Sequence, residues 1–152
     1  MPGKRMRPKD ENDASRGYRV HVKDTGPPDN KNKTWVFEQR ESSMNATGQL
    51  LVRVVIAKIT DRNRLLRLLN DAPVVQNDPR WNCVVWVQEA MKVLATDGKA
   101  LGTSKMDWQT VRDTAMGYCQ KKKDAHRFDG KGKFNMLKPA TYDLLDRKET
   151  MP

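Results

Sequence analysis

Apolar and polar side chains alternate near the start of the chain, over residues 18–23. The alternating positions are Tyr18, Arg19, Val20, His21, Val22 and Lys23. A period of two residues predicts a β-strand with one buried and one solvated face. A turn-rich stretch over residues 25–30 ends this strand, and the sequence Thr-Trp-Val-Phe-Glu at 34–38 predicts a second strand, which is its candidate hairpin partner.

The most β-rich run of the chain covers residues 50–59, where only Arg53 and Lys58 interrupt the apolar side chains. Because apolar residues occupy both faces of this run, we expect a central strand. Helical spacing follows. A cap at Thr60 or Asp61 begins a short amphipathic helix to residue 70, and a later helix is predicted from about residue 107 to 123, with Tyr118 on its buried side.

The helix between these two has the most apolar sequence, and it ends near residues 97–98. Its best predicted cap is Asp78, followed by Pro79 as the first helical residue, although Asn82 could cap a helix that starts slightly later. Because this helix is apolar around most of its circumference, we expect it to be the core of the protein. The remainder, from about residue 124, is predicted to be a loop-rich tail.

Together these elements predict an α+β fold, with a small antiparallel sheet on a buried central helix and two further helices. We expect residues 1–16 to form a loose basic arm and residues 17–150 to form a single domain. No apolar run reaches the roughly 20 residues that cross a bilayer, and Cys83 and Cys119 have no zinc or disulfide spacing. The expectation is a soluble intracellular protein, cytoplasmic or also nuclear, with no membrane span, cofactor or metal.

The formal net charge of +10 raises the question of a nucleic-acid partner. The excess lies at the two ends of the chain, and the run Lys121-Lys122-Lys123 ends a predicted helix, where the helix dipole favours cations. No zinc-finger, helix-turn-helix or aromatic RNA-binding motif accompanies the charge. We therefore favour solvated charge over a nucleic-acid site.

Cys83 is the candidate for chemistry, because it lies in the opening turn of the most apolar helix. There the helix dipole and unpaired N–H groups favour a thiolate and can stabilise an oxyanion. A nucleophilic thiol also needs a base, and His21 on the first strand is preferred to His126, which follows a lysine-rich helix end. The candidate substrate-binding residues adjoin Cys83 in sequence: Trp81, Asn82 and Trp86. The alternative is that Cys83 and the tryptophans only pack in the core.

Four stretches, at residues 18–23, 74–83, 97–103 and 142–145, resemble an uncharacterised family of small proteins known mainly from fungal genomes, and this resemblance extends from Gly17 to Glu149. More distantly, Asn82-Cys83 at a helix start resembles the circularly permuted papain-like fold of the lecithin:retinol acyltransferase and NlpC type. That resemblance implies a catalytic cysteine preceded in sequence by a histidine on a strand, as His21 precedes Cys83. In such folds the principal histidine lies on the first strand of the hairpin, and residues 4–17 contain none. Either His21 has taken over as base, or the fold persists without the reaction.

The leading hypothesis is a cysteine-dependent hydrolase or acyltransferase that acts on an acyl or amide substrate through a thioester, with Cys83 as nucleophile and His21 as base. The alternative is a non-catalytic binding module of the same fold that binds a protein partner or a polyanion. Nucleic-acid binding is the weakest of the three hypotheses. The sequence does not give the oligomeric state.

Overall fold

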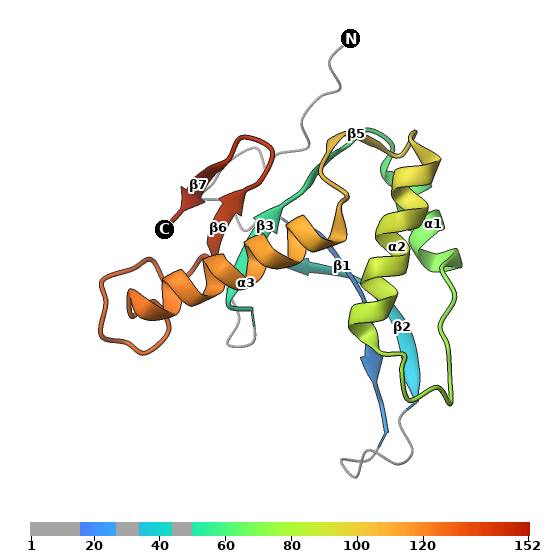
Figure 1. The fold of residues 1–152 in the computed structure, drawn as a ribbon, viewed down its shortest axis with the longest axis horizontal. Coiled ribbons are helices and arrows are strands. Elements are labelled where there is room, and N and C mark those ends of the chain that lie inside the picture. Colours follow the sequence, from blue (N-terminus) through green and yellow to red (C-terminus); the bar gives the residue numbers. More distant parts are fainter. Residues whose placement is uncertain (1–15, 27–33, 44–49) are drawn as a thin grey trace. The chain divides into compact units, whose positions relative to one another are not determined.

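The computed structural model describes residues 16–26, 34–43 and 50–152. The fold is α+β, as predicted, with three helices and small sheets in the described residues (Figure 1). The expected arm over residues 1–16 lies outside the described residues, except for Arg16. The described residues divide into two compact units: residues 16–26, 34–43 and 59–102 belong to the first, and residues 50–58 and 103–152 belong to the second.

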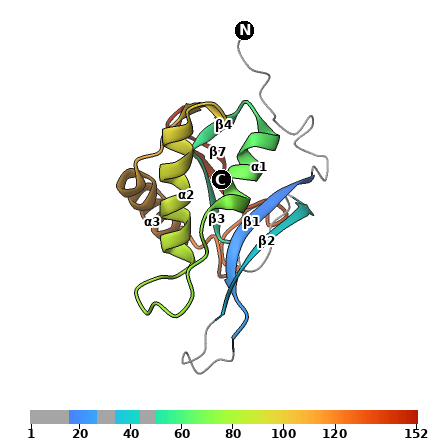
Figure 2. The same ribbon diagram turned by 90° about the vertical axis from the view of Figure 1, so that its right-hand side faces the viewer.

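The first unit contains a two-stranded antiparallel ribbon, formed by β1 (Arg16–Asp24) and β2 (Trp35–Ser43) (Figure 2). The predicted pairing of these segments is confirmed, and both strands are longer than their sequence patterns indicate. Val22 lies opposite Phe37, and His21 lies opposite Glu38. Because successive side chains of a strand point to opposite faces, these two pairs belong to opposite faces of the ribbon.

Two helices complete the first unit: α1 (Arg62–Asp71) and α2 (Cys83–Asp97). Asp61 caps α1, as predicted. The preferred cap for α2 was wrong, because Asn82 and not Asp78 caps the helix. The Asn82 side chain accepts hydrogen bonds from the N–H groups of Val84 and Val85 at 3.0 and 3.1 Å. At the other end, Gly98 takes the left-handed conformation, with φ of 65°, that favours glycine at a helix end.

The core of the first unit lies between α2 and the apolar face of the ribbon. Its buried members come from β1, the residue after α1, the segment before α2, and α2 itself: Val22, Ala72, Trp81, Trp86 and Ala90. Aromatic rings of β2 pack against the two buried tryptophans, with ring centroids 6.0 Å apart for Trp35–Trp81 and 5.9 Å for Phe37–Trp86. As expected, α2 contributes to the core, but it also has an exposed side, where Val84 keeps 50% of its surface exposed.

The second unit contains a three-stranded sheet in the order β3-β6-β7. These strands are β3 (Val52–Val55), β6 (Ala140–Asp143) and β7 (Lys148–Met151), with β3 parallel and β7 antiparallel to β6. The run at 50–59 is therefore not one central strand. It breaks at Ile56, whose carbonyl accepts the N–H of Lys105, and continues as β4 (Ala57–Ile59), which pairs with β5 (Leu101–Ser104).

The last helix, α3 (Trp108–Asp124), contacts β3 and is capped by Asp107. Its predicted start and the burial of Tyr118 are confirmed. Lys122, one turn later, is also buried, and its Nζ lies 2.6 Å from Oε2 of Glu149 on β7. The Tyr118 hydroxyl donates to the same carboxylate oxygen at 2.7 Å. One carboxylate thus joins β7 to two side chains of α3.

No helix of the described residues combines the length and the apolar character that a bilayer crossing needs.

Candidate functional site

Cys83 is the first residue of α2, and its thiol is free and partly buried. Asn82, a predicted substrate-binding residue, caps the helix with its side-chain oxygen. The N–H groups of Val84 and Val85 therefore already have an acceptor. A helix start can offer its unpaired N–H groups to an oxyanion, and these are two of them. The cap therefore reduces the number of N–H donors that are left for an oxyanion.

Trp81 and Trp86, the other predicted substrate-binding residues, lie in the core of the first unit. Their exposed fractions are 6% and 3%. The indole Nε1 of Trp81 lies 3.5 Å from Oε2 of Glu89, whereas the buried Nε1 of Trp86 has no hydrogen-bond acceptor among the described residues. Both rings contact the ribbon rather than bulk solvent, which is the core-packing role left open by the sequence.

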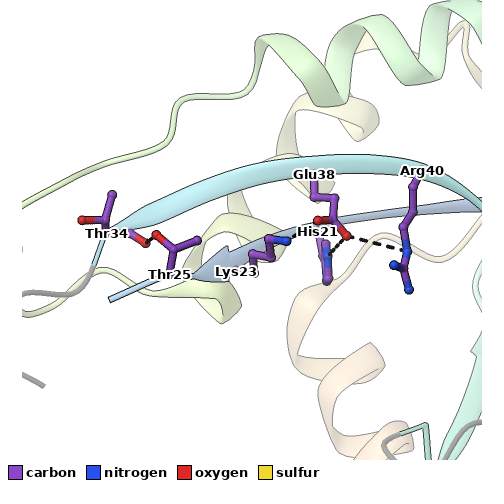
Figure 3. A network of polar contacts seen from close by, with 6 residues as sticks. All are labelled: His21, Lys23, Thr25, Thr34, Glu38 and Arg40. Carbon is purple, nitrogen blue, oxygen red and sulfur yellow. Dashed lines mark hydrogen bonds and ion pairs between the residues drawn. The ribbon is translucent and has the colours of Figure 1, made fainter. Parts of the chain in front are cut away.

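His21 lies on the other face of the ribbon. Its neighbour Val22 is buried with Trp86 on the face against which α2 packs, so alternation turns the His21 side chain away from that face. The His21 Nε2 lies 3.2 Å from Oε1 of Glu38, and Figure 3 shows this contact among polar side chains of the ribbon. The structure thus brings Trp81 and Trp86 together with β1, but it gives His21 a carboxylate partner on the opposite face.

The polar face of the ribbon is a cluster of cations around one carboxylate. We call it the outer face and define it by five side chains from the two strands: Arg19, His21, Lys23, Glu38 and Arg40. The Lys23 ammonium forms an ion pair with Oε2 of Glu38, and the Nε of Arg40 lies 3.7 Å from its Oε1 (Figure 3). Across the strands, Arg19 lies opposite Arg40. Three basic side chains therefore contact a single carboxylate, and a fourth, Arg19, lies on the same face opposite Arg40.

The electrostatics of the outer face follow from these contacts. Hydrogen bonds from Lys23 and then from His21 lower the pKa of Glu38 to about 2. The carboxylate stays ionised at any physiological pH and offsets one charge of the cluster. The cations Arg19, Lys23 and Arg40 still exceed it in number, so the face is positively charged even when His21 is neutral.

Glu38 and Arg40 were not singled out from the sequence. The predicted second strand ends at residue 38. The pairing register that places Glu38 beside His21 depends on the conformation of the connection over residues 25–34, which the sequence pattern does not predict. Residues 36–40 read Val-Phe-Glu-Gln-Arg and do not alternate, so the sequence carries no clear signal for these two residues. Arg19 and Lys23, by contrast, were placed on the polar face from the start.

Two further features of the described residues bear on chemistry: the second histidine and the search for a metal site. His126 is exposed and its Nδ1 lies 2.6 Å from Asp129, in agreement with the expectation of a solvated histidine. In the part of the chain that the structure describes, no three histidine, cysteine, aspartate or glutamate side chains group in a way that could hold a metal ion.

Comparisons with known proteins give one relationship. Neither the curated proteins nor the solved structures contained a match to this chain. A family model described as a family of unknown function, DUF6914, matches residues 5–151. Since that match spans nearly the whole chain, the protein belongs to the DUF6914 family.

Proposed function

We propose that the protein is a non-catalytic binding module, and that the outer face of the β1–β2 ribbon binds an acidic segment of a partner protein in the cytoplasm. The observation that supports this proposal is the excess of cations around Glu38 on one face of a two-stranded ribbon. The opposite face is committed to the core through Val22 and Phe37. Only the outer face is thus available to a partner along both strands.

An acidic protein segment suits this face better than a nucleic acid does. The Glu38 carboxylate lies between the cations and stays ionised down to a pH of about 2. A continuous phosphate backbone would place like charge against it, which disfavours binding. A protein segment can place carboxylates near Arg19, Lys23 and Arg40 and a polar or basic side chain near Glu38.

The test is a binding titration of the full chain with a fluorescent peptide rich in Asp and Glu, at low salt. Lys23→Gln and Arg40→Gln should each weaken binding by about threefold, and Glu38→Gln should strengthen it by a similar factor, as expected for single exposed charges. Lys99→Gln is the matched control, because it removes the same charge from an exposed site of the first unit outside the ribbon. Its affinity should equal that of the unmodified chain.

Two results would contradict the proposal. If Lys99→Gln weakens binding as much as Lys23→Gln does, the peptide responds to net charge and not to the outer face. If duplex DNA binds more tightly than the peptide, with an affinity that falls steeply as salt is added and depends on Lys23, the face belongs to a nucleic-acid site.

The cysteine hydrolase or acyltransferase of permuted papain-like type stays as a second candidate. The observation in its favour is the position of Cys83 at the amino-terminal residue of α2, with a partly accessible thiol. The orientation of His21 away from the α2 face counts against His21 as its base. The reactivity of the thiol separates this candidate from the binding module, because an activated thiol is alkylated faster than an inert one.

A further inference from the structure

The connection between α3 and β6, residues 125–139, exposes two adjacent apolar side chains. Leu137 keeps 77% of its surface exposed and Met136 keeps 57%. Leu137 has the largest exposed fraction among the large hydrophobic residues that the structure describes. We call these two residues the Met-Leu tip. A single exposed apolar side chain is common on a protein surface, but two adjacent ones beside basic side chains offer a contact surface with both apolar and charged character.

The backbone beneath the tip is fixed by a buried arginine. Arg127 is only 3% exposed. Its Nη2 donates to the carbonyls of Asn135 at 2.9 Å and Lys138 at 2.7 Å, and its Nη1 lies 2.8 Å from the sulfur of Met136. The N–H of Leu137 donates to the Asn135 side chain at 3.0 Å. Both sides of the tip are therefore hydrogen-bonded to one guanidinium, and the tip is presented by a built support.

Aromatic packing closes the base of the connection against α3. The Arg127 guanidinium lies 5.1 Å from the ring centroid of Phe134, and the Lys122 ammonium lies 5.7 Å from the same ring. Gly132 passes so close to Phe134 that a Cβ there would lie 2.4 Å from the ring. In Figure 1 the connection, in orange, curls beside the end of α3. The outward position of the tip thus follows from packing at its base.

Cations flank the tip along the chain and at the end of α3. Lys122 and Arg127 are buried within the unit. Four other lysines of residues 121–138 are exposed or half-buried and make no ion pair with any described residue: Lys123, Lys131, Lys133 and Lys138. Of the two acids in the same stretch, Asp129 is paired with His126 and Asp124 accepts from Gln120. The surroundings of the tip are therefore positive.

We propose that the Met-Leu tip and its flanking lysines form a peripheral docking site for an anionic lipid surface. An interfacial site combines a few apolar side chains that enter the headgroup layer with basic side chains that are attracted to acidic lipids. A nucleic acid would attract the lysines through its phosphates, but it would leave Leu137 exposed to water. The lysines have long flexible stems and no fixed acceptors, which suits a surface of mobile headgroups better than the defined geometry of a protein pocket.

The experiment is co-sedimentation of the full chain with vesicles at low salt. Vesicles of phosphatidylcholine and phosphatidylserine should bind the protein at least about tenfold more tightly than vesicles of phosphatidylcholine alone, as the summed attraction of several lysines implies. Leu137→Ser should weaken binding by about tenfold, because it removes most of the inserted apolar surface. The double variant Lys133→Gln/Lys138→Gln should weaken it at least as much and reduce its salt dependence.

The matched control is Met116→Ser, which removes an apolar side chain that is 64% exposed on α3 and has no place at the tip. It should bind as the unmodified chain does. Leu137→Ser should lower the vesicle affinity by the same factor in the unmodified chain and in the Lys23→Gln/Arg40→Gln variant. This result would separate the site from the outer face. The proposal is overturned if anionic vesicles do not bind the chain, if Leu137→Ser binds as tightly as the unmodified chain, or if Met116→Ser loses as much affinity as Leu137→Ser.

Discussion

His21 shows how much a single residue's environment can be predicted from sequence. Alternation along residues 18–23 correctly places it on the polar face of a strand. The sequence does not say against which face α2 packs, because that depends on contacts between residues far apart in the chain, such as Val22 with Trp86. For the same reason Glu38, the carboxylate that His21 contacts, was not predicted.

The thiols allow a direct comparison of the two functional hypotheses. Cys83 and Cys119 are both free and partly buried, and the base preferred from sequence, His21, is hydrogen-bonded to Glu38. For a binding module we expect a small alkylating reagent near neutral pH to label the two cysteines at rates within about fivefold of each other, since neither has an adjacent base. Mass spectrometry of each cysteine-containing peptide measures the two rates.

His21→Ala is the companion variant in this experiment, and the binding module predicts no change in Cys83 labelling. Labelling of Cys83 that is faster than that of Cys119 by about a hundredfold, and that slows in His21→Ala, would instead support the enzyme.

At the level of elements, helices were predicted better than strands. Asp61 and Asp107 mark helix starts in the sequence, and both cap their helices in the structure. The short strands β5, β6 and β7 were missed because each has only four residues, too few for a period of two to stand out. Their pairing depends on partners elsewhere in the chain, as β6 depends on β3 and β7.

The start of α2 gives a prediction about capping. Asn82→Ala should lower the free energy of unfolding by about 1 kcal/mol, because the N–H groups of Val84 and Val85 lose their acceptor. Asp78→Ala, at the cap preferred from sequence, should cost less than half as much, since the Asp78 side chain accepts only the exposed N–H of Arg80. Urea denaturation followed by circular dichroism compares the two variants. Equal losses would indicate that α2 begins before Cys83 in solution.

At the scale of the whole molecule, basic groups exceed acidic ones by 10, and several of the carboxylates accept hydrogen bonds from specific donors. Hydrogen bonds from Arg64 and from the Ala100 N–H lower the pKa of Asp97. A hydrogen bond from Thr110 lowers the pKa of Asp107, and one from His126 lowers that of Asp129. These acids occupy a helix end, a helix cap and a turn, so the stability of both units depends on ionised carboxylates.

The same groups predict how stability changes in acid. A carboxylate whose pKa is lower in the folded chain than in the unfolded chain stabilises the fold fully above its ordinary pKa, and this contribution is lost as the pH falls through the folded value. For Glu38 that window runs from the ordinary value of 4.5 down to about 2. We expect the melting temperature to fall between about pH 5 and about pH 2, and added salt to restore part of the loss, because protonation leaves the basic side chains uncompensated. Differential scanning calorimetry across this range measures both effects.

Glu38→Gln is the companion variant. Its melting temperature should fall less steeply with decreasing pH than that of the unmodified chain, since it lacks one of the titrating acids. A melting temperature that stays constant from pH 5 to pH 2 would mean that these ion pairs do not stabilise the fold.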